Sequence, residues 1–241
     1  MPVWTVRPRR ARPLVRVLYL HGGGYVHPLT KDYWRLVRAL AGTPAEVVVP
    51  AYPLAPGADV DEVLPRLVTL AGTLLDDPLP LVVMGDSAGG ALTLVVAARL
   101  RGRDREPLAL VCLSPWLDAT LTDHLDEVQD LDPTDPMLAE SGLRAAGRWW
   151  AGRRSPDDPL VSPLHEDLRG LPPIHLHVGR RDILRPAVDD LADRVRATPG
   201  ATLTVRERTA MFHVWMTRAV PEGAATRREL RTLLRELPAD R

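Results

Sequence analysis

The chain has 241 residues, of which 45% are hydrophobic and 26% charged, so it is long enough and apolar enough to fold around a sizeable core. Lysine plus arginine and aspartate plus glutamate both number 31, and this balance gives no overall bias toward nucleic acid or an anionic membrane. No apolar run approaches the roughly 20 residues of a membrane span, and the basic N-terminus lacks the features of a signal peptide.

The first part of the chain predicts two strands and a glycine-rich turn. Residues 3–6 have the pattern of a short edge strand, and residues 14–20 alternate loosely, as a second strand would. The second strand ends in the motif HGGGY at residues 21–25. Three glycines let the backbone approach a ligand closely and turn its N–H groups inward. No phosphate-loop Gly-Lys-Ser/Thr follows, so an oxyanion-binding loop fits better than a nucleotide site.

Two helices and a buried strand come next. Residues 32–41 form an amphipathic pattern, and residues 46–50 read as a buried strand of the parallel type. A loop is expected over residues 52–58. The helix expected over residues 59–75 contains Pro65, which we expect to disturb it.

Residues 81–90 combine a strand, a tight turn and a helix. The apolar residues 81–84 predict the strand, the turn has the pattern G-x-S-x-G, and residues 88–101 predict the helix. A nucleophile on such a turn lies in strained backbone, so the residues two before and two after it must be small. The pattern predicts that Ser87 is a nucleophile, with a glycine-rich turn that merely contains a serine as the alternative. For Asp86 we expect hydrogen bonding at the N-terminus of the helix.

The middle of the chain is less regular. Residues 108–113 predict a strand that buries Cys112, the single cysteine, for which a nucleophilic thiol is the alternative. One cysteine allows no disulfide within the chain, which fits a reducing cytoplasm. Between residues 114 and 173, prolines recur and the one clear helix covers residues 137–150, which include Trp149 and Trp150.

The last part of the chain alternates strands and helices again. Strands are expected over residues 174–178 and 203–206, and helices over residues 186–197 and 222–237. Strands alternating with helices at this spacing predict an α/β fold, a mostly parallel sheet flanked by helices on both faces. We see no internal repeat or low-complexity linker, so the whole chain, residues 1–241, is expected to form a single domain.

A serine nucleophile needs a base, and the base needs an acid that fixes its tautomer. Ser87, Asp182 and His213 supply the order Ser, Asp, His, and Asp182 closely follows the strand at 174–178, at the same edge of the sheet as Ser87. The rival acids Asp189 and Asp190 lie within a predicted helix. The rival histidines are His21, which we expect to brace the glycine loop, and His27, His124, His165, His175 and His177. The last two form an H-x-H pair that could hold a metal, but no third ligand is evident nearby.

Several stretches together resemble one family. HGGGY at 21–25 and GDSAGG at 85–90 look like the hormone-sensitive-lipase branch of the α/β-hydrolase fold. The further matches are YPLAP at 52–56, with proline where arginine is usual, SPWLD at 114–118, DPLVSPL at 158–164, GRRDIL at 179–184 and MFH at 211–213. They extend over nearly the whole chain.

The resemblance implies a function and roles for individual residues. It implies a serine carboxylesterase that cleaves short-acyl esters by a Ser-His-Asp acyl-enzyme mechanism, without metal or organic cofactor. The backbone N–H groups of Gly23, Gly24 and Ala88 would form the oxyanion hole. A small cap insert is expected around residues 118–160. Tyr25, Trp149 and Trp150 are the expected substrate-binding side chains, although the tryptophans could instead pack the cap onto the body.

The chain also departs from the family pattern. Family members usually carry a longer segment before HGGG, so we expect one or two first strands and the N-terminal part of the cap to be missing. The active site should then be open, roofed only by the insert or by a partner subunit, and a homodimer would cover the bare sheet edge. The expected partner is otherwise a small-molecule ester. An arylformamidase or other amide hydrolase, a metabolite deacetylase, and a non-catalytic binding protein of the same fold are the alternatives.

Overall fold

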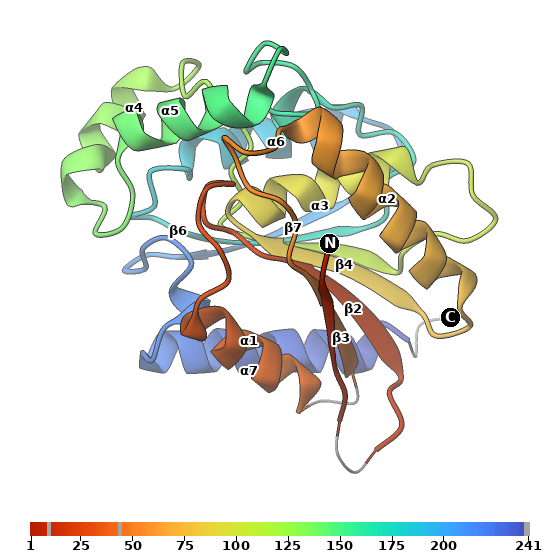
Figure 1. Ribbon diagram of the computed structural model, residues 1–241. Helices are drawn as coiled ribbons and strands as arrows, with labels where there is room; N and C mark the ends of the chain where they lie inside the picture. Colours follow the sequence, from red (N-terminus) through yellow and green to blue (C-terminus); the bar gives the residue numbers. More distant parts are fainter. Residues whose placement is uncertain (9–10, 43–44, 239–241) are drawn as a thin grey trace.

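Alternating apolar side chains build the strands of one twisted sheet (Figure 1). The computed structural model describes residues 1–8, 11–42 and 45–238. Within them the sheet has seven strands in the order β1-β3-β2-β4-β5-β6-β7, and only β1 runs antiparallel to its neighbour. The strands are β1 (Val3–Val6), β2 (Val15–Leu20), β3 (Ala45–Pro50), β4 (Leu81–Asp86), β5 (Ala109–Leu113), β6 (Ile174–Gly179) and β7 (Leu203–Arg208). The predicted α/β fold with a mostly parallel sheet is confirmed.

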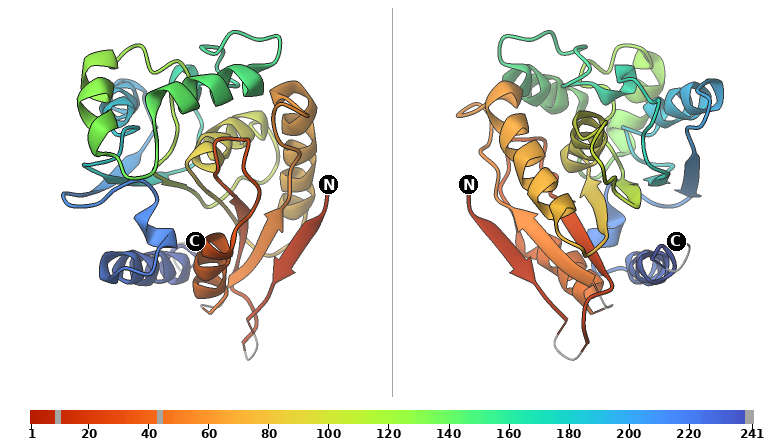
Figure 2. Two further views of the ribbon diagram at one scale, coloured as in Figure 1. Left: turned by 60° about the vertical axis from the view of Figure 1, so that its left-hand side comes forward. Right: turned by 90° about the vertical axis from the view of Figure 1, so that its right-hand side faces the viewer.

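Helices cover both faces of this sheet (Figures 1 and 2). They are α1 (Lys31–Ala41), α2 (Val60–Asp76), α3 (Ala88–Arg99), α4 (Leu125–Leu131), α5 (Glu140–Ala151), α6 (Pro186–Ala197) and α7 (Pro221–Glu236). Helices α1 and α7 lie on one face, and α2, α3 and α6 on the other. Helices α4 and α5 belong to the insert and lie above the sheet in Figure 1. Three short 3-10 turns complete the elements, η1 (Asp132–Thr134), η2 (Pro163–His165) and η3 (Trp215–Thr217).

The side-chain alternation of β2 shows how the two faces are filled. Val17 and Tyr19 belong to the core cluster that contains Leu36 of α1. Leu18 belongs to the opposite cluster, which contains Leu67 of α2. Because successive side chains of a strand point to opposite faces, a strand such as β2 that is buried at every position must be covered on both sides.

The insert differs most from the sequence-based expectation. The helix expected over residues 137–150 begins at Glu140, because the Asp135 carboxylate accepts the backbone N–H groups of Met137 and Leu138 and holds them in a turn. Helix α4 was not predicted, since Val128 is its one buried residue and its apolar periodicity is weak. Helix α2 continues through Pro65 as one helix. None of the helices in the described ranges is both long and apolar enough to cross a bilayer.

Candidate active site

Ser87 stands on the sharp turn between β4 and α3. Its φ of 51° and ψ of −121° place a non-glycine residue in strained backbone. The turn closes because its neighbours are small: a Cβ on Gly85 would collide with the carbonyl oxygen of Gly89, and a Cβ on Gly89 with that of Leu20. The backbone N–H of Ser87 donates to the carbonyl oxygen of Leu113 at 2.8 Å, which holds the turn against β5. This is the strand–turn–helix geometry that the G-x-S-x-G pattern predicts.

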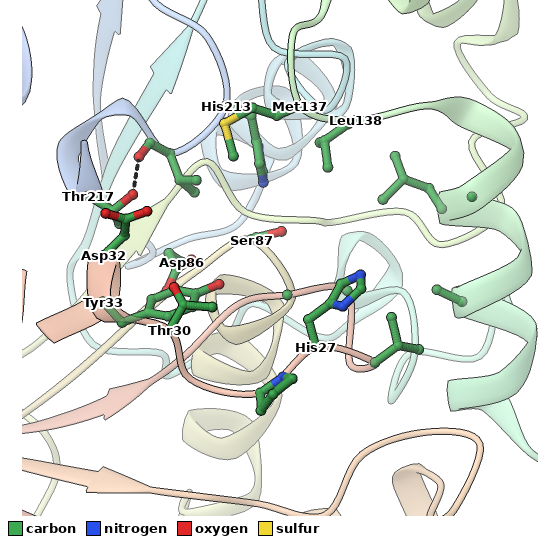
Figure 3. A pocket seen from close by; sticks show the side chains of 18 of the residues that line it. His27, Thr30, Asp32, Tyr33, Asp86, Ser87, Met137, Leu138, His213 and Thr217 are labelled. Atoms are coloured by element: carbon green, nitrogen blue, oxygen red, sulfur yellow. Dashed lines mark hydrogen bonds between the residues drawn. The ribbon is translucent and has the colours of Figure 1, made fainter. Parts of the chain in front are cut away.

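Asp182 and His213 meet in the buried region beside this turn. His213 Nδ1 lies 3.1 Å from Asp182 Oδ1 and 3.0 Å from Oδ2, and both side chains are buried. Asp182 closely follows β6, and His213 lies in the loop after β7. Ser87 and His213 line one pocket, and Figure 3 shows the His213 ring pointing into it toward Ser87. The structure therefore brings the three predicted residues to one place from three distant parts of the sequence.

The charges around His213 favour its protonated form. Burial by itself lowers the pKa of the imidazole, because an imidazolium is poorly solvated there. The charge and hydrogen bond of Asp182 oppose this, with smaller contributions from Asp135 and Asp86, and the net pKa is raised. A base that takes a proton during a reaction is stabilised by such carboxylates at the moment it becomes charged.

Two further contacts hold the segments of Asp182 and His213 in place. The backbone N–H of Leu184 donates to Asp182 Oδ1 at 3.0 Å. The hydroxyl of Ser114 accepts the backbone N–H of Val214, the residue after His213, at 3.1 Å. Sequence reasoning did not assign Ser114 a role, although its position in the SPWLD stretch is a signal that could have drawn attention to it.

The glycine loop after β2 presents free N–H groups to the same pocket. Gly23 and Gly24 have φ values of 97° and 59°, which side chains rarely adopt. The backbone N–H groups of Gly23, Gly24 and Ala88 make no hydrogen bond within the described residues. Ala88 is the first residue of α3, where the amide has no partner inside the helix. His21 braces the loop, as expected, with Nδ1 2.8 Å from the carbonyl oxygen of Gly22.

The Asp86 carboxylate supports this loop instead of α3. Its Oδ1 accepts the Tyr19 hydroxyl at 2.5 Å and the backbone N–H of Gly22 at 3.0 Å, while its Oδ2 has no hydrogen-bond partner among the described residues. The expectation that Asp86 binds the N-terminus of the helix is therefore wrong. The residue is the last one of β4 and its side chain reaches across to β2. Burial raises the pKa of Asp86 to about 6, although its hydrogen bonds and the charge of His213 oppose the rise.

The pocket at Ser87 has a volume of about 380 Å³ and two chemically different sides. The insert supplies a mostly apolar side, made of Met137, Leu138, Ala139, Gly142, Leu143 and Ala146. The body supplies a polar side, made of Thr30, Asp32, Tyr33, Thr217 and Arg218. Figure 3 shows labelled members of the polar side and the helix of the insert on opposite sides of Ser87. The insert is thus the roof of the pocket, as expected.

The three aromatic residues expected to bind substrate lie outside the pocket lining. Trp150 is fully buried and stacks on Tyr25, with ring centroids 4.1 Å apart and an interplanar angle of 4°. Trp149, on the outer side of α5, is 52% exposed. Trp150 therefore packs the insert onto the residue that follows Gly24, which is the alternative that the sequence left open.

Comparison with known proteins places this geometry in a family. Residues 17–217 match the model of a family described by the α/β-hydrolase fold. An acetyl-hydrolase of Streptomyces hygroscopicus is 33% identical in an alignment of 215 positions that covers 87% of this chain and 71% of that protein. The carboxylesterase/phospholipase LipF of Mycobacterium tuberculosis is 30% identical in an alignment of 245 positions that covers 93% of this chain and 62% of that protein.

A crystal structure decides between branches of the fold. An esterase from the bacterial hormone-sensitive lipase family superposes with a TM-score of 0.91 at 30% identity, covering 98% of this chain and 81% of that chain. The chain belongs to the hormone-sensitive-lipase branch of the α/β-hydrolase fold. Several relatives and structural neighbours are named as esterases or carboxylesterases, and the chain is accordingly a serine ester hydrolase.

Of the rival acids and histidines, His27 lines the same pocket, whereas Asp189 and Asp190 are engaged elsewhere. Asp189 pairs with Arg185 at the surface, and Asp190 lies 2.8 Å from His124 Nε2. His175 and His177 both lie on β6, and no group of three metal-ligating side chains comes together in the described part of the chain. Burial raises the pKa of the Cys112 thiol to about 12, so it is a poor nucleophile.

Proposed function

We propose that this esterase hydrolyses short-acyl carboxylic esters through an acyl-enzyme formed on Ser87. The observation that carries the proposal is the buried pair of His213 and Asp182, with Nδ1 3.0 Å from the carboxylate, at the pocket that also holds Ser87. A serine is a weak nucleophile without such a base, and the base is effective when an acid fixes its tautomer.

In the first half of the reaction, Ser87 Oγ attacks the ester carbonyl carbon while His213 Nε2 takes the hydroxyl proton. Asp182 accepts the hydrogen bond of Nδ1–H and stabilises the imidazolium that forms. When the tetrahedral intermediate collapses, His213 returns the proton to the leaving alcohol oxygen and the acyl group stays on Ser87. In the second half, His213 activates a water molecule that releases the carboxylic acid.

The negative charge of the tetrahedral intermediate needs donors aimed at its oxygen. We assign this role to the backbone N–H groups of Gly23, Gly24 and Ala88, because they are unpaired within the described residues and border the turn of Ser87. Donors fixed before the reaction need no reorganisation as charge develops, and loss of one such donor typically costs about 10²–10³ in rate.

The short-acyl preference is supported by the size of the pocket. A volume of about 380 Å³ lies near the lower end of the range for small-molecule sites. Leu138 and Leu143 line its apolar side, where we expect the acyl chain to lie. We therefore expect acetyl and butyryl esters to be better substrates than octanoyl esters.

The test is hydrolysis of p-nitrophenyl acetate, butyrate and octanoate by the wild type and by Ser87→Ala, each checked for folding by circular dichroism. The expected result is turnover of the short esters and a loss of at least about 10³-fold in kcat for the variant. An N-formyl arylamine is the additional substrate that separates an ester hydrolase from an arylformamidase. A folded wild type that is silent on all three esters and is not labelled by a fluorophosphonate would refute the proposal.

We further propose a cytoplasmic homodimer. The single Cys112, buried and unpaired, fits a reducing compartment. The edge strand β1 exposes Val3 and Trp4 by 42% and 43%, and an exposed apolar edge is usually covered or paired. Light scattering coupled to gel filtration tests the dimer, and a monomer at micromolar concentration would refute it.

A further inference from the structure

One carboxylate of the insert joins the roof of the pocket to the loop that carries the triad acid. Asp135 Oδ1 accepts the backbone N–H groups of Met137 at 2.8 Å and Leu138 at 3.0 Å. Its Oδ2 accepts the backbone N–H of Ile183 at 3.0 Å. The two segments are 48 positions apart in the sequence, and Asp135 is partly buried between them.

The three donors belong to functionally important segments. Met137 and Leu138 line the pocket. Ile183 directly follows Asp182, so the bond from its N–H fixes the peptide that leads away from the triad acid. Asp182 in turn holds the ring of His213 through Nδ1. The position of the roof is thus linked to the position of the base through two carboxylates in series: Asp135 binds the roof and the loop of Asp182, and Asp182 binds His213.

We infer that Asp135 is a positioning residue of the esterase, which aligns the Asp182–His213 pair and ties it to the pocket roof. The inference rests on the triad proposed above. Charged hydrogen bonds to backbone N–H groups are roughly twice as strong as neutral ones, so a carboxylate suits this task better than an amide. A displacement of the base by 1 Å is enough to slow catalysis about 100-fold.

The charge of Asp135 also acts on His213. It is one of the carboxylates that raise the pKa of the imidazole, with Asp182 and Asp86. Further polar or titratable groups that line the pocket with His213 are Asp32 and Tyr33 of α1, His27 of the glycine loop and Arg218 after η3. Removal of the Asp135 charge leaves all of these in place, so the expected pKa change of His213 is downward.

The sequence provides a matched control three residues earlier. Asp132 lies in the same segment, and its Oδ1 accepts the backbone N–H of Glu140 at 2.7 Å, at the first residue of α5. It therefore supports the insert and, among the described residues, makes no hydrogen bond to the loop after β6. Asp132→Asn and Asp135→Asn remove the same charge from the same segment, and only the second weakens the link to Asp182.

The experiment measures kcat and kcat/KM for p-nitrophenyl butyrate between pH 5 and 9 in the wild type, Asp132→Asn, Asp135→Asn and Asp135→Ala. It also measures the pKa of His213 by NMR titration, at a temperature where unfolding curves show each variant to be folded. We expect Asp135→Asn and Asp135→Ala to lower kcat by about 10-fold to 100-fold. The acid limb of kcat/KM and the pKa of His213 should both move to lower pH. Asp132→Asn should stay within about threefold of wild type, with an unchanged acid limb.

Two results would overturn the inference. One is a folded Asp135→Asn with wild-type kcat and an unmoved His213 pKa. The other is an Asp132→Asn variant that loses as much activity as Asp135→Asn, since the loss would then reflect the stability of the insert. The NMR titration needs no turnover, so it still reports on Asp135 if the wild type proves inactive on esters, which would count against the proposed function alone.

Discussion

The contact between Trp150 and Tyr25 should carry much of the attachment of the insert to the body. Trp150 is fully buried, and its ring lies 4.1 Å from that of Tyr25, which in turn stacks on Trp116 at 5.5 Å. A buried aromatic side chain removes about 150–250 Å² from water, which at about 25 cal/mol per Å² corresponds to about 4–6 kcal/mol. The alanine side chain still buries part of this area, so Trp150→Ala should lower the free energy of unfolding by about 3–5 kcal/mol.

The neighbouring residue supplies the control. Trp149 is on the same helix but is 52% exposed. Trp149→Ala should therefore change the free energy of unfolding by about 1 kcal/mol or less. Trp150→Phe keeps an aromatic ring and removes the indole Nε1, which is buried without a hydrogen-bond partner among the described residues. Its cost should be well below that of alanine.

The assay is urea unfolding of the three variants and the wild type, followed by circular dichroism, with kcat for p-nitrophenyl butyrate measured on the same preparations. Because Tyr25 follows Gly24, loss of the ring stack should loosen the loop that carries the proposed oxyanion donors. We expect kcat of Trp150→Ala to fall by at least about tenfold, but by no more than the roughly 10²–10³ that complete loss of one oxyanion donor typically costs. A loss of stability below about 1 kcal/mol in Trp150→Ala, or an equal loss in Trp149→Ala, would refute the reasoning.

Three further changes test the site. Asp182→Asn should lower kcat by about 10³–10⁴ and move the acid limb of kcat/KM to lower pH, because the carboxylate raises the pKa of His213, as a pH profile would show. The pKa of Asp86 is raised to about 6 from an ordinary 3.8, so its protonated form stabilises the folded wild type at low pH, and this contribution is lost as the pH rises through 6. Urea unfolding from pH 4 to 8 should therefore show the free energy of unfolding of Asp86→Asn rising relative to wild type by up to about 3 kcal/mol. A difference that stays constant with pH would contradict this. A Cβ on Gly142 meets no atom within 4 Å and would enter the pocket, so Gly142→Leu should slow p-nitrophenyl octanoate more than acetate in parallel rate measurements.

The parts of the fold that were predictable are those with local signals. The turn at Ser87 was readable because Gly85 and Gly89 stand two positions before and after the serine in the sequence, although the collision that a Cβ on Gly89 would make is with Leu20 of β2. The limits of most strands and helices were predicted to within one or two residues. Buried strands appear as short continuous apolar runs, and amphipathic helices show apolar residues at a period of about 3.6. The meeting of Ser87, Asp182 and His213 at one edge of the sheet could be predicted because each residue follows a strand end, where parallel strands gather their loops.

The roof of the pocket could not be predicted in the same way. Outside α5 the apolar residues of the insert carry little periodicity. On α5, Leu143 and Trp150 belong to the same buried face, yet Leu143 lines the pocket and Trp150 does not. The contacts of Asp86 could not be predicted either, because its partners Tyr19 and Gly22 lie more than sixty residues away. Pocket lining is a tertiary property, so neighbouring aromatic residues in the sequence were a poor guide to it.

The polar contacts of the insert fix its position over the pocket, which hydrophobic packing alone does not do. The insert leaves the sheet after β5 and returns at β6, so the chain alone leaves its register over the pocket undetermined. Apolar contacts such as that of Trp150 favour burial without fixing direction. Directional bonds fix it: Asp135 binds the loop of Asp182, and Arg181 Nη2 donates to the carbonyl oxygen of Thr134 at 3.3 Å. A change of the roof that alters acyl selectivity is therefore expected to alter the triad as well, unless the Asp135 link is preserved.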